Sequence, residues 1–146
     1  MARRIKVLQL HPDYNIKTHD FADLGEQIFH ALPSERFETV NAFLRGRPTG
    51  DQPESRAERS IYFEFSDAQL KGMRIRAMWQ LFRYCRNERF DVVICNRFKP
   101  VNMMLMLNRW LKIPLCIGIA HGFGEYELSQ FRKILPIVLS IKLVLT

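Results

Sequence analysis

Residues 121–125, His-Gly-Phe-Gly-Glu, place an imidazole and two glycines directly after an apolar, strand-like run. Imidazole changes its protonation near neutral pH and can act as an acid, a base or a hydrogen-bond donor. Glycine has no Cβ, so a ligand can approach its backbone closely. We therefore take His121 as the candidate catalytic residue and Gly122 as part of its binding surface. The alternative is a histidine with a purely structural role.

A second polar segment, residues 11–20, lies between the first strand-like run and a helical pattern. The free N–H groups at the start of a helix, together with its dipole, favour anionic or hydroxyl-rich ligands. The alternative is a solvated loop in which Asp20 only caps the helix. The candidate binding residues of this segment are His11, Asp13, Asn15, Lys17 and His19.

A third segment, Asn-Arg-Phe-Lys-Pro at residues 96–100, follows a β-branched apolar run. An arginine can hold a phosphate or a carboxylate with two parallel hydrogen bonds. Asn96, Arg97 and Lys99 are therefore candidate ligand-binding residues, and solvated charges at the end of a strand are the alternative.

Other familiar sites are not expected. No glycine-rich phosphate loop follows the first strand-like run, which argues against tight dinucleotide or nucleoside triphosphate binding there. The four histidines and three cysteines lack zinc-site spacing, so we expect no metal site. Cys85, Cys95 and Cys116 lie in apolar runs without C-x-x-C spacing, a pattern typical of buried, reduced thiols in a cytosolic protein.

Basic residues outnumber acidic ones, 22 to 15, for a formal net charge of +7, which favours polyanionic partners. Helical spacing over residues 68–89 predicts an apolar stripe of Leu70, Met73, Ala77, Leu81 and Tyr84. On the opposite face it places Arg76, Arg83 and Arg86 around Trp79. This basic face is a candidate membrane-binding surface, and a merely solvated face is the alternative.

The elements that must position these residues follow from periodicity and from breaker residues. The 146 residues suit one domain, 1–146, with a mobile loop at about 45–60. Strand-like runs and helical patterns alternate, so we expect a doubly wound, mostly parallel Rossmann-like α/β sheet whose ligands bind at the carboxyl ends of its strands. The expected strands are 5–10, 37–44, 61–65, 91–95, 113–120 and 141–145, and the expected helices are 21–32, 68–89, 100–111 and 128–139.

No transmembrane helix is expected, because polar residues or prolines interrupt both long apolar stretches, 101–120 and 134–146. The N-terminus lacks the apolar region of a secretory signal. We expect a cytoplasmic protein, and peripheral attachment to the inner face of the plasma membrane stays open.

At three places the sequence resembles the N-terminal half of bacterial GT-B glycosyltransferases. These places are the first strand with its loop, the Asp-Val-Val-Ile-Cys run at 91–95 and the Ile-Ala-His-Gly-Phe-Gly segment at 119–124. The sequence looks most like the retaining, family-4-type enzymes that build lipopolysaccharide and related envelope glycans. The resemblance covers essentially the whole chain in element order.

The resemblance implies a Rossmann-like domain that binds the acceptor, with a second domain holding the nucleotide sugar. His121 would contact the transferring sugar, and residues 11–19 would form the first-strand loop. The glutamate pair of the family's nucleotide-sugar domain has no counterpart here. We therefore expect part of an enzyme that moves a hexose to a lipid-linked or oligosaccharide acceptor, without metal or cofactor and inactive until a donor-binding half is supplied.

Two other readings stay open. One is a basic α/β module for nucleic acid or another polyanion, although no aromatic-rich RNA motif or helix-turn-helix pattern supports it, and we expect no nucleic-acid partner. The other is a flavodoxin-like or response-type domain without transferase activity.

Overall fold

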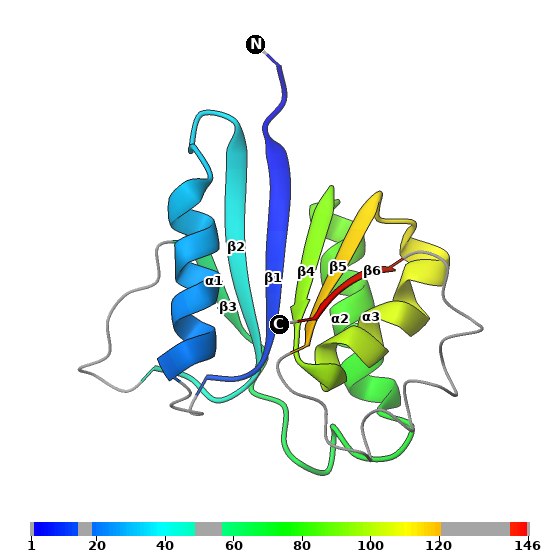
Figure 1. Ribbon diagram of the computed structural model, residues 1–146. Helices are drawn as coiled ribbons and strands as arrows, with labels where there is room; N and C mark the ends of the chain where they lie inside the picture. Colours follow the sequence, from blue (N-terminus) through cyan, green and yellow to red (C-terminus); the bar gives the residue numbers. More distant parts are fainter. Residues whose placement is uncertain (1, 15–18, 49–56, 121–140, 146) are drawn as a thin grey trace.

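The computed structural model describes residues 2–14, 19–48, 57–120 and 141–145, and the side chains of 19–23, 120 and 141–145 lie outside the description. Within these ranges the chain forms six strands and three helices (Figure 1). The strands are β1 (Ile5–Asp13), β2 (Phe37–Arg45), β3 (Arg59–Tyr62), β4 (Val92–Asn96), β5 (Leu115–Ala120) and β6 (Ile141–Leu145). The helices are α1 (His19–Ala31), α2 (Ile75–Glu88) and α3 (Phe98–Leu111).

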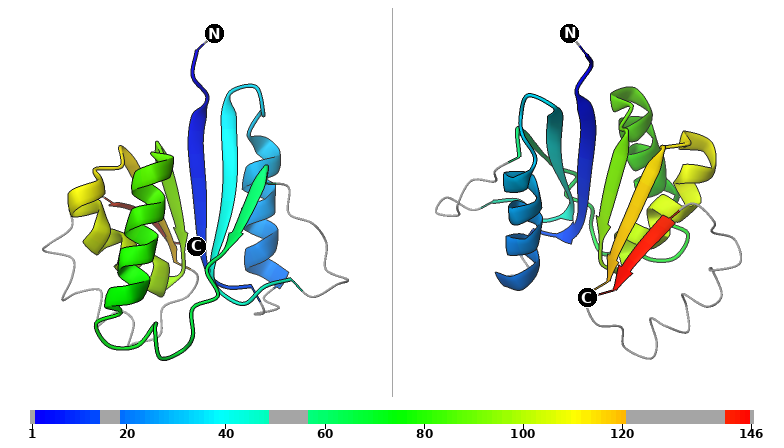
Figure 2. Two further views of the ribbon diagram at one scale, coloured as in Figure 1. Left: turned by 180° about the vertical axis from the view of Figure 1, so that it is seen from behind. Right: turned by 45° about the horizontal axis from the view of Figure 1, so that its top comes forward.

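All described strand pairs are parallel, and the strand order is β3-β2-β1-β4-β5-β6. The direction of winding reverses between β1 and β4, so α1 packs on one face of the sheet and α2 and α3 pack on the other (Figure 2). This is the doubly wound, Rossmann-like α/β fold that the alternation of strands and helices predicts.

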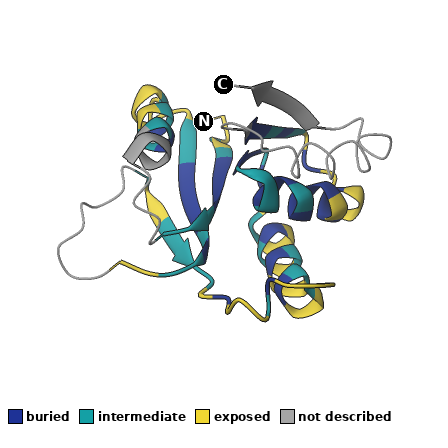
Figure 3. Ribbon diagram, turned by 60° about the horizontal axis from the view of Figure 1, so that its bottom comes forward, coloured by how far each residue is buried: buried dark blue, intermediate teal, exposed yellow. Residues whose placement is uncertain are grey.

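Both faces of the central strands are covered, which explains their nearly continuous apolar sequences. On β1, Leu8 and Leu10 pack toward α2 and α3, whereas Val7 belongs to a smaller cluster with Phe29 of α1. Figure 3 shows the buried residues along the strands and on the inner sides of α2 and α3, with exposed residues facing outward. The sheet is thus fixed from both sides, and its carboxyl edge is a rigid frame for side chains.

Helix α2 begins at Ile75, seven residues later than the sequence predicts. A closed turn precedes it, in which the Ser66 N–H donates to Gln69 Oε1 at 2.8 Å and the Gln69 N–H donates to Ser66 Oγ at 3.2 Å. Gly72 then takes a positive φ of 62°, which ends the turn without starting the helix. Met73, expected in the buried stripe, is consequently 81% exposed, and that assignment was wrong.

Strand β3 is Arg59–Tyr62 and not 61–65 as predicted. Its register aligns Tyr62 with Phe43 of β2, and Glu64, with a φ of 53°, interrupts the extended backbone soon afterwards. Strand β1 continues to Asp13, so the first three residues of the expected loop belong to the sheet. The predicted helix 128–139 and the middle half of the predicted mobile loop, residues 49–56, lie outside the described residues.

An ion-pair cluster at the amino edge joins β1, β2, β3 and α2. Lys6 Nζ lies 3.0 Å from Glu88 Oε2, and one Arg59 nitrogen lies 2.8 Å from both Glu38 and Glu88. The hydrogen bonds from Arg59 hold the pKa of Glu88 at about 2. These contacts fix the start of the sheet to the end of α2.

The three cysteines are free and buried, as the sequence predicts. Burial raises the pKa of Cys85 to about 12 and that of Cys116 to about 11. Burial also raises the pKa of Cys95 well above its ordinary value. Thiols in this state are poor nucleophiles, so they serve packing.

Candidate functional site

The carboxyl edge of the sheet is the candidate site, because β1 and β4 end there on either side of the point where the strand order reverses. All three helices also begin at this edge, the lower one in Figure 1. In open α/β sheets ligands bind in this position.

His11 lies near the end of β1 and is 8% exposed. Its ring stacks on Phe43, with centroids 4.9 Å apart, and its Nε2 lies 3.1 Å from Asn41 Oδ1. The Asn41 amide nitrogen donates to Glu26 Oε1 at 3.2 Å, so its oxygen must accept from His11. This relay makes His11 the Nε2–H tautomer. Burial lowers its pKa to about 4, so the ring is neutral at pH 7.

Gln9 is a fully buried polar residue that the sequence reasoning did not single out. Its amide nitrogen donates to the Gly25 carbonyl at 2.9 Å, while its Oε1 has no partner among the described residues. A Cβ at Gly25 would come within 2.6 Å of that oxygen, so glycine is what lets α1 lie so close to β1. Gln9, His11 and Asn41 thus form a buried polar layer. The sequence signal that could have revealed it is the presence of Gln9 and Asn41 inside strand-like runs.

The remaining residues of the predicted first segment are only partly described. Asp13 is half-buried, and its Oδ2 lies 3.5 Å from Arg45 Nε at the end of β2. Arg45 also contacts Asp67 Oδ1 at 2.6 Å. Asn15 and Lys17 lie outside the described residues, and His19 is the first residue of α1, with its side chain outside the description.

Asn96 ends β4 and is 2% exposed. Its Nδ2 finds no hydrogen-bond partner among the described residues. A buried amide donor without a partner costs about 1–3 kcal/mol, so a group that accepts its hydrogen bond would be favoured there. Strand alternation places Asn96 on the same face as Ile94, the α1 face of the sheet.

Lys99 lies in the first turn of α3 and is half-buried. Burial lowers its pKa, and the positive charges of Arg74 and Arg45 lower it further, against the opposing effect of Asp67. The carboxyl edge thus brings together cations from the end of β2, the start of α2 and the start of α3. The sequence predicted Lys99 and Arg97 for this site but missed Arg74 and Arg45.

The residues that precede α2 and α3 are arginines in strained backbone conformations. Arg74 has φ 51° and ψ 30°, Arg97 has φ 68° and ψ 172°, and neither helix has a side-chain cap or an acidic residue in its first turn. Left-handed backbone costs a residue with a Cβ about 1–2 kcal/mol, and the region that Arg97 occupies is essentially restricted to glycine. Serine, threonine, aspartate or asparagine would normally stand there.

The structure describes the predicted basic face of α2 but not the predicted residues after β5. His121 and Gly122 lie outside the described residues, after β5, which ends at this same edge. The basic face of α2 is exposed as predicted: Arg76, Arg83 and Arg86 lie at the surface, and Trp79 is 60% exposed. Nothing in the described structure assigns that face a partner.

In the described part of the chain, no helix has the length and apolar character needed to cross a membrane. The same residues contain no cluster of three or more His, Cys, Asp or Glu side chains that could hold a metal ion. No known family model matches this sequence, and no curated protein matches it either.

Proposed function

We propose that the carboxyl edge binds an anionic, hydroxyl-bearing ligand, and that this domain serves as the acceptor-binding part of a glycosyl-transfer enzyme. The observation that carries the proposal is the pair of strained arginines at the starts of α2 and α3, beside Lys99. Fold stability alone does not explain them.

The physical cost of this arrangement is large for a small domain. A cation at a helix N-terminus opposes the helix dipole by about 0.3–1 kcal/mol, in addition to the backbone strain and the missing cap. A bound anion offsets the missing cap and the unfavourable interaction between cation and helix dipole, since it accepts hydrogen bonds from the free N–H groups and neutralises the guanidinium and ammonium charges. Strained residues of this kind gather at binding sites.

Two features support the proposal that the ligand carries sugar hydroxyls: the buried amide of Asn96 and the resemblance of the sequence to a known family. Asn96, directly before Arg97, has an amide N–H without a partner among the described residues, which it can offer to a hydroxyl or carbonyl oxygen. A sugar phosphate or a lipid-linked sugar carries both the anionic group and the hydroxyls that such an edge suits. The sequence resemblance to GT-B acceptor domains favours the same ligand class, with the hexose supplied from a nucleotide sugar on a separate donor-binding half.

We expect Lys99→Gln and Arg74→Gly each to weaken binding of a hexose 1-phosphate by about tenfold or more, the effect of losing a hydrogen bond to a charged group. Arg74→Gly should also raise the free energy of unfolding by about 1 kcal/mol, because glycine relieves the left-handed backbone. Isothermal titration calorimetry and urea denaturation measure the two quantities.

Arg36→Gln is the matched control, because Arg36 is an exposed cation directly before β2, at the opposite edge. It should leave the affinity unchanged. If all three variants bind alike, the carboxyl edge does not hold the anion. Glucose binding as tight as that of its 1-phosphate would contradict the anionic part of the proposal.

We also propose that the basic face of α2 attaches the domain to the inner face of the plasma membrane. Reversing Arg76, Arg83 and Arg86 to glutamate should abolish sedimentation with phosphatidylserine vesicles, since each surface cation contributes about 1 kcal/mol near such a membrane. Binding of the unaltered chain should weaken from low salt to 0.5 M salt, because screening shortens the reach of the charges. Unchanged sedimentation of the triple variant, or tighter binding to a DNA duplex than to vesicles, would refute this.

A further inference from the structure

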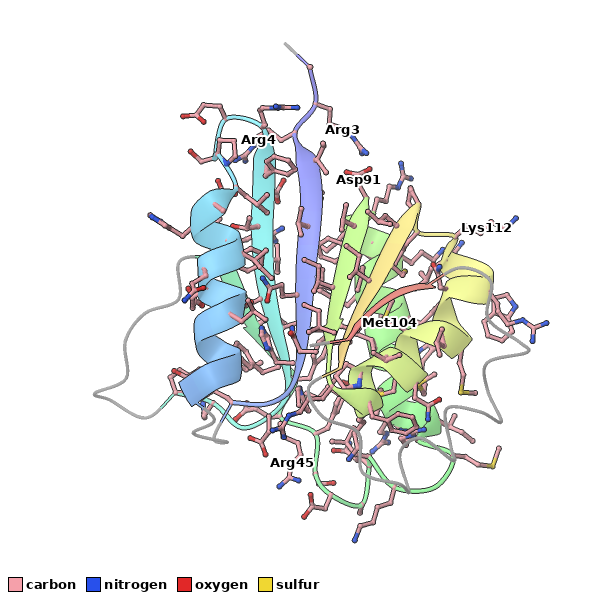
Figure 4. The ribbon with its side chains drawn as sticks, in the orientation of Figure 1. Arg3, Arg4, Arg45, Asp91, Met104 and Lys112 are labelled. Carbon is pink, nitrogen blue, oxygen red and sulfur yellow. The ribbon has the colours of Figure 1, made fainter. Side chains whose placement is uncertain are left out.

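The amino edge of the sheet holds a hollow between the C-terminal ends of α2 and α3. Its volume is about 680 Å³, within the usual range for small-molecule sites. The residues that line it include Arg86, Arg89 and Lys112, together with Phe82 and Trp110. Figure 4 shows Lys112 at this upper edge, on the same side as Arg3 and Asp91.

The acidic charge in this hollow is already compensated. Asp91 forms an ion pair with Arg3 and accepts a hydrogen bond from the Lys6 N–H at 2.9 Å. None of the other three lining cations, Arg86, Arg89 and Lys112, forms an ion pair within the described residues. The hollow is therefore electropositive.

The helix ends reduce this positive charge but do not cancel it. Each helix C-terminus carries about half a negative charge, so α2 and α3 together contribute about −1 against the three cations. The remainder, about +2, matches the charge of a phosphate monoester near neutral pH, about −1.5 to −2. The electrostatics thus favour one doubly charged group over a long polyanion.

Two of the cations stand where glycine is the usual residue. Arg89 and Lys112 end α2 and α3 in the left-handed conformation, with φ of 56° and 52°, and their N–H groups bond back to Cys85 and Asn108. Glycine would close these helices with less strain. Both positions therefore carry a side chain at a conformational cost, and both residues line the same hollow.

The aromatic lining points to the rest of the ligand. Trp110 is 67% exposed at the rim, and Phe82 is half-buried with its ring stacked on Trp79 at 5.9 Å between centroids. A planar ring can stack on an exposed indole, and leaving Trp110 in water has no packing benefit. The lining thus combines three exposed cations with the exposed ring of Trp110, over buried apolar residues.

We propose that this hollow is a binding site for a small phosphate monoester that carries an aromatic ring, a ligand of nucleoside monophosphate type. The site is distinct from the carboxyl edge and does not depend on the function proposed there.

Adenosine 5′-monophosphate is the probe, titrated calorimetrically into the 146-residue chain. We expect one site that binds this nucleotide more tightly than adenosine or inorganic phosphate. Arg89→Gly and Lys112→Gly should each weaken it by about tenfold or more without lowering the unfolding temperature. Trp110→Ala should weaken the nucleotide but not phosphate, because only the ring interaction is removed.

Lys99→Gln, a cation removed from the carboxyl edge, is the control and should leave the nucleotide affinity unchanged. The proposal is overturned by absent binding at millimolar nucleotide, by phosphate binding as tightly as the nucleotide, or by a loss that follows Lys99→Gln and not Arg89→Gly. A lowered unfolding temperature in both glycine variants would overturn the inference that these cations are held at a conformational cost.

Discussion

Lowering the pH from 7 to 4 should reduce the free energy of unfolding by about 3 kcal/mol through His11 alone. Burial lowers the pKa of His11 to about 4 in the folded chain, while the unfolded chain titrates near 6.5. Between these values the unfolded state binds a proton that the folded state excludes, so acid favours unfolding. The full contribution is present above pH 6.5 and is lost as the pH falls toward 4. Urea denaturation at steps of half a pH unit measures it.

His11→Gln is the control, since glutamine can still donate to Asn41 but does not titrate. From pH 7 to pH 4 the unaltered chain should lose about 3 kcal/mol of stability relative to this variant. Glu88 contributes in a separate window, because its folded pKa of about 2 lies below the ordinary value of 4.5 and its stabilisation is lost only as the pH falls through that lower range. Parallel pH curves for the two proteins would show that His11 can be protonated in place.

Met104→Ala should lower the free energy of unfolding by about 2–5 kcal/mol, the usual cost of deleting a large buried side chain. Met104, on α3, is fully buried in the larger apolar cluster, together with residues of the sheet. Its removal leaves a cavity in the larger apolar cluster, which the rigid sheet cannot collapse to fill. Chemical denaturation of the purified variant gives the value.

Met106→Ala is a closely matched comparison, because Met106 lies two residues further along the same helix and is 51% exposed. Its substitution should change the stability by no more than about 0.5 kcal/mol. Equal effects at the two positions would mean that α3 does not pack against the sheet through the face that contains Met104.

The fold class was predictable because its signals are local. A β-branched run such as residues 91–95 and the helical spacing of the segments between runs depend only on neighbouring residues. The exposed basic face of α2 followed from the same spacing. The start of α2 did not, because the turn closed by Ser66 and Gln69 competes with the helix, and the spacing of apolar residues does not register that competition.

The candidate site was only half predictable. Asn96, Arg97 and Lys99 were found because they follow a recognisable strand, whereas Gln9 and Asn41 were hidden within apolar strand sequences. His11 was expected to face a ligand from a loop; the structure instead shows it as a strand residue with its Nε2 bonded to Asn41. The roles expected of His121 and Gly122 stay predictions.

By itself the sequence determined the residue types, the alternation of strands and helices, and the excess of positive charge. Only the tertiary structure decided which of those charges meet. Arg45, Arg74 and Lys99 come from three elements and converge because parallel strands and right-handed crossovers bring the helix starts to one edge. Arg89 and Lys112 line one hollow at the other edge because α2 and α3 end side by side there. Which residues become neighbours in this way depends on the order and register of the strands. Contacts between residues far apart in the chain set both.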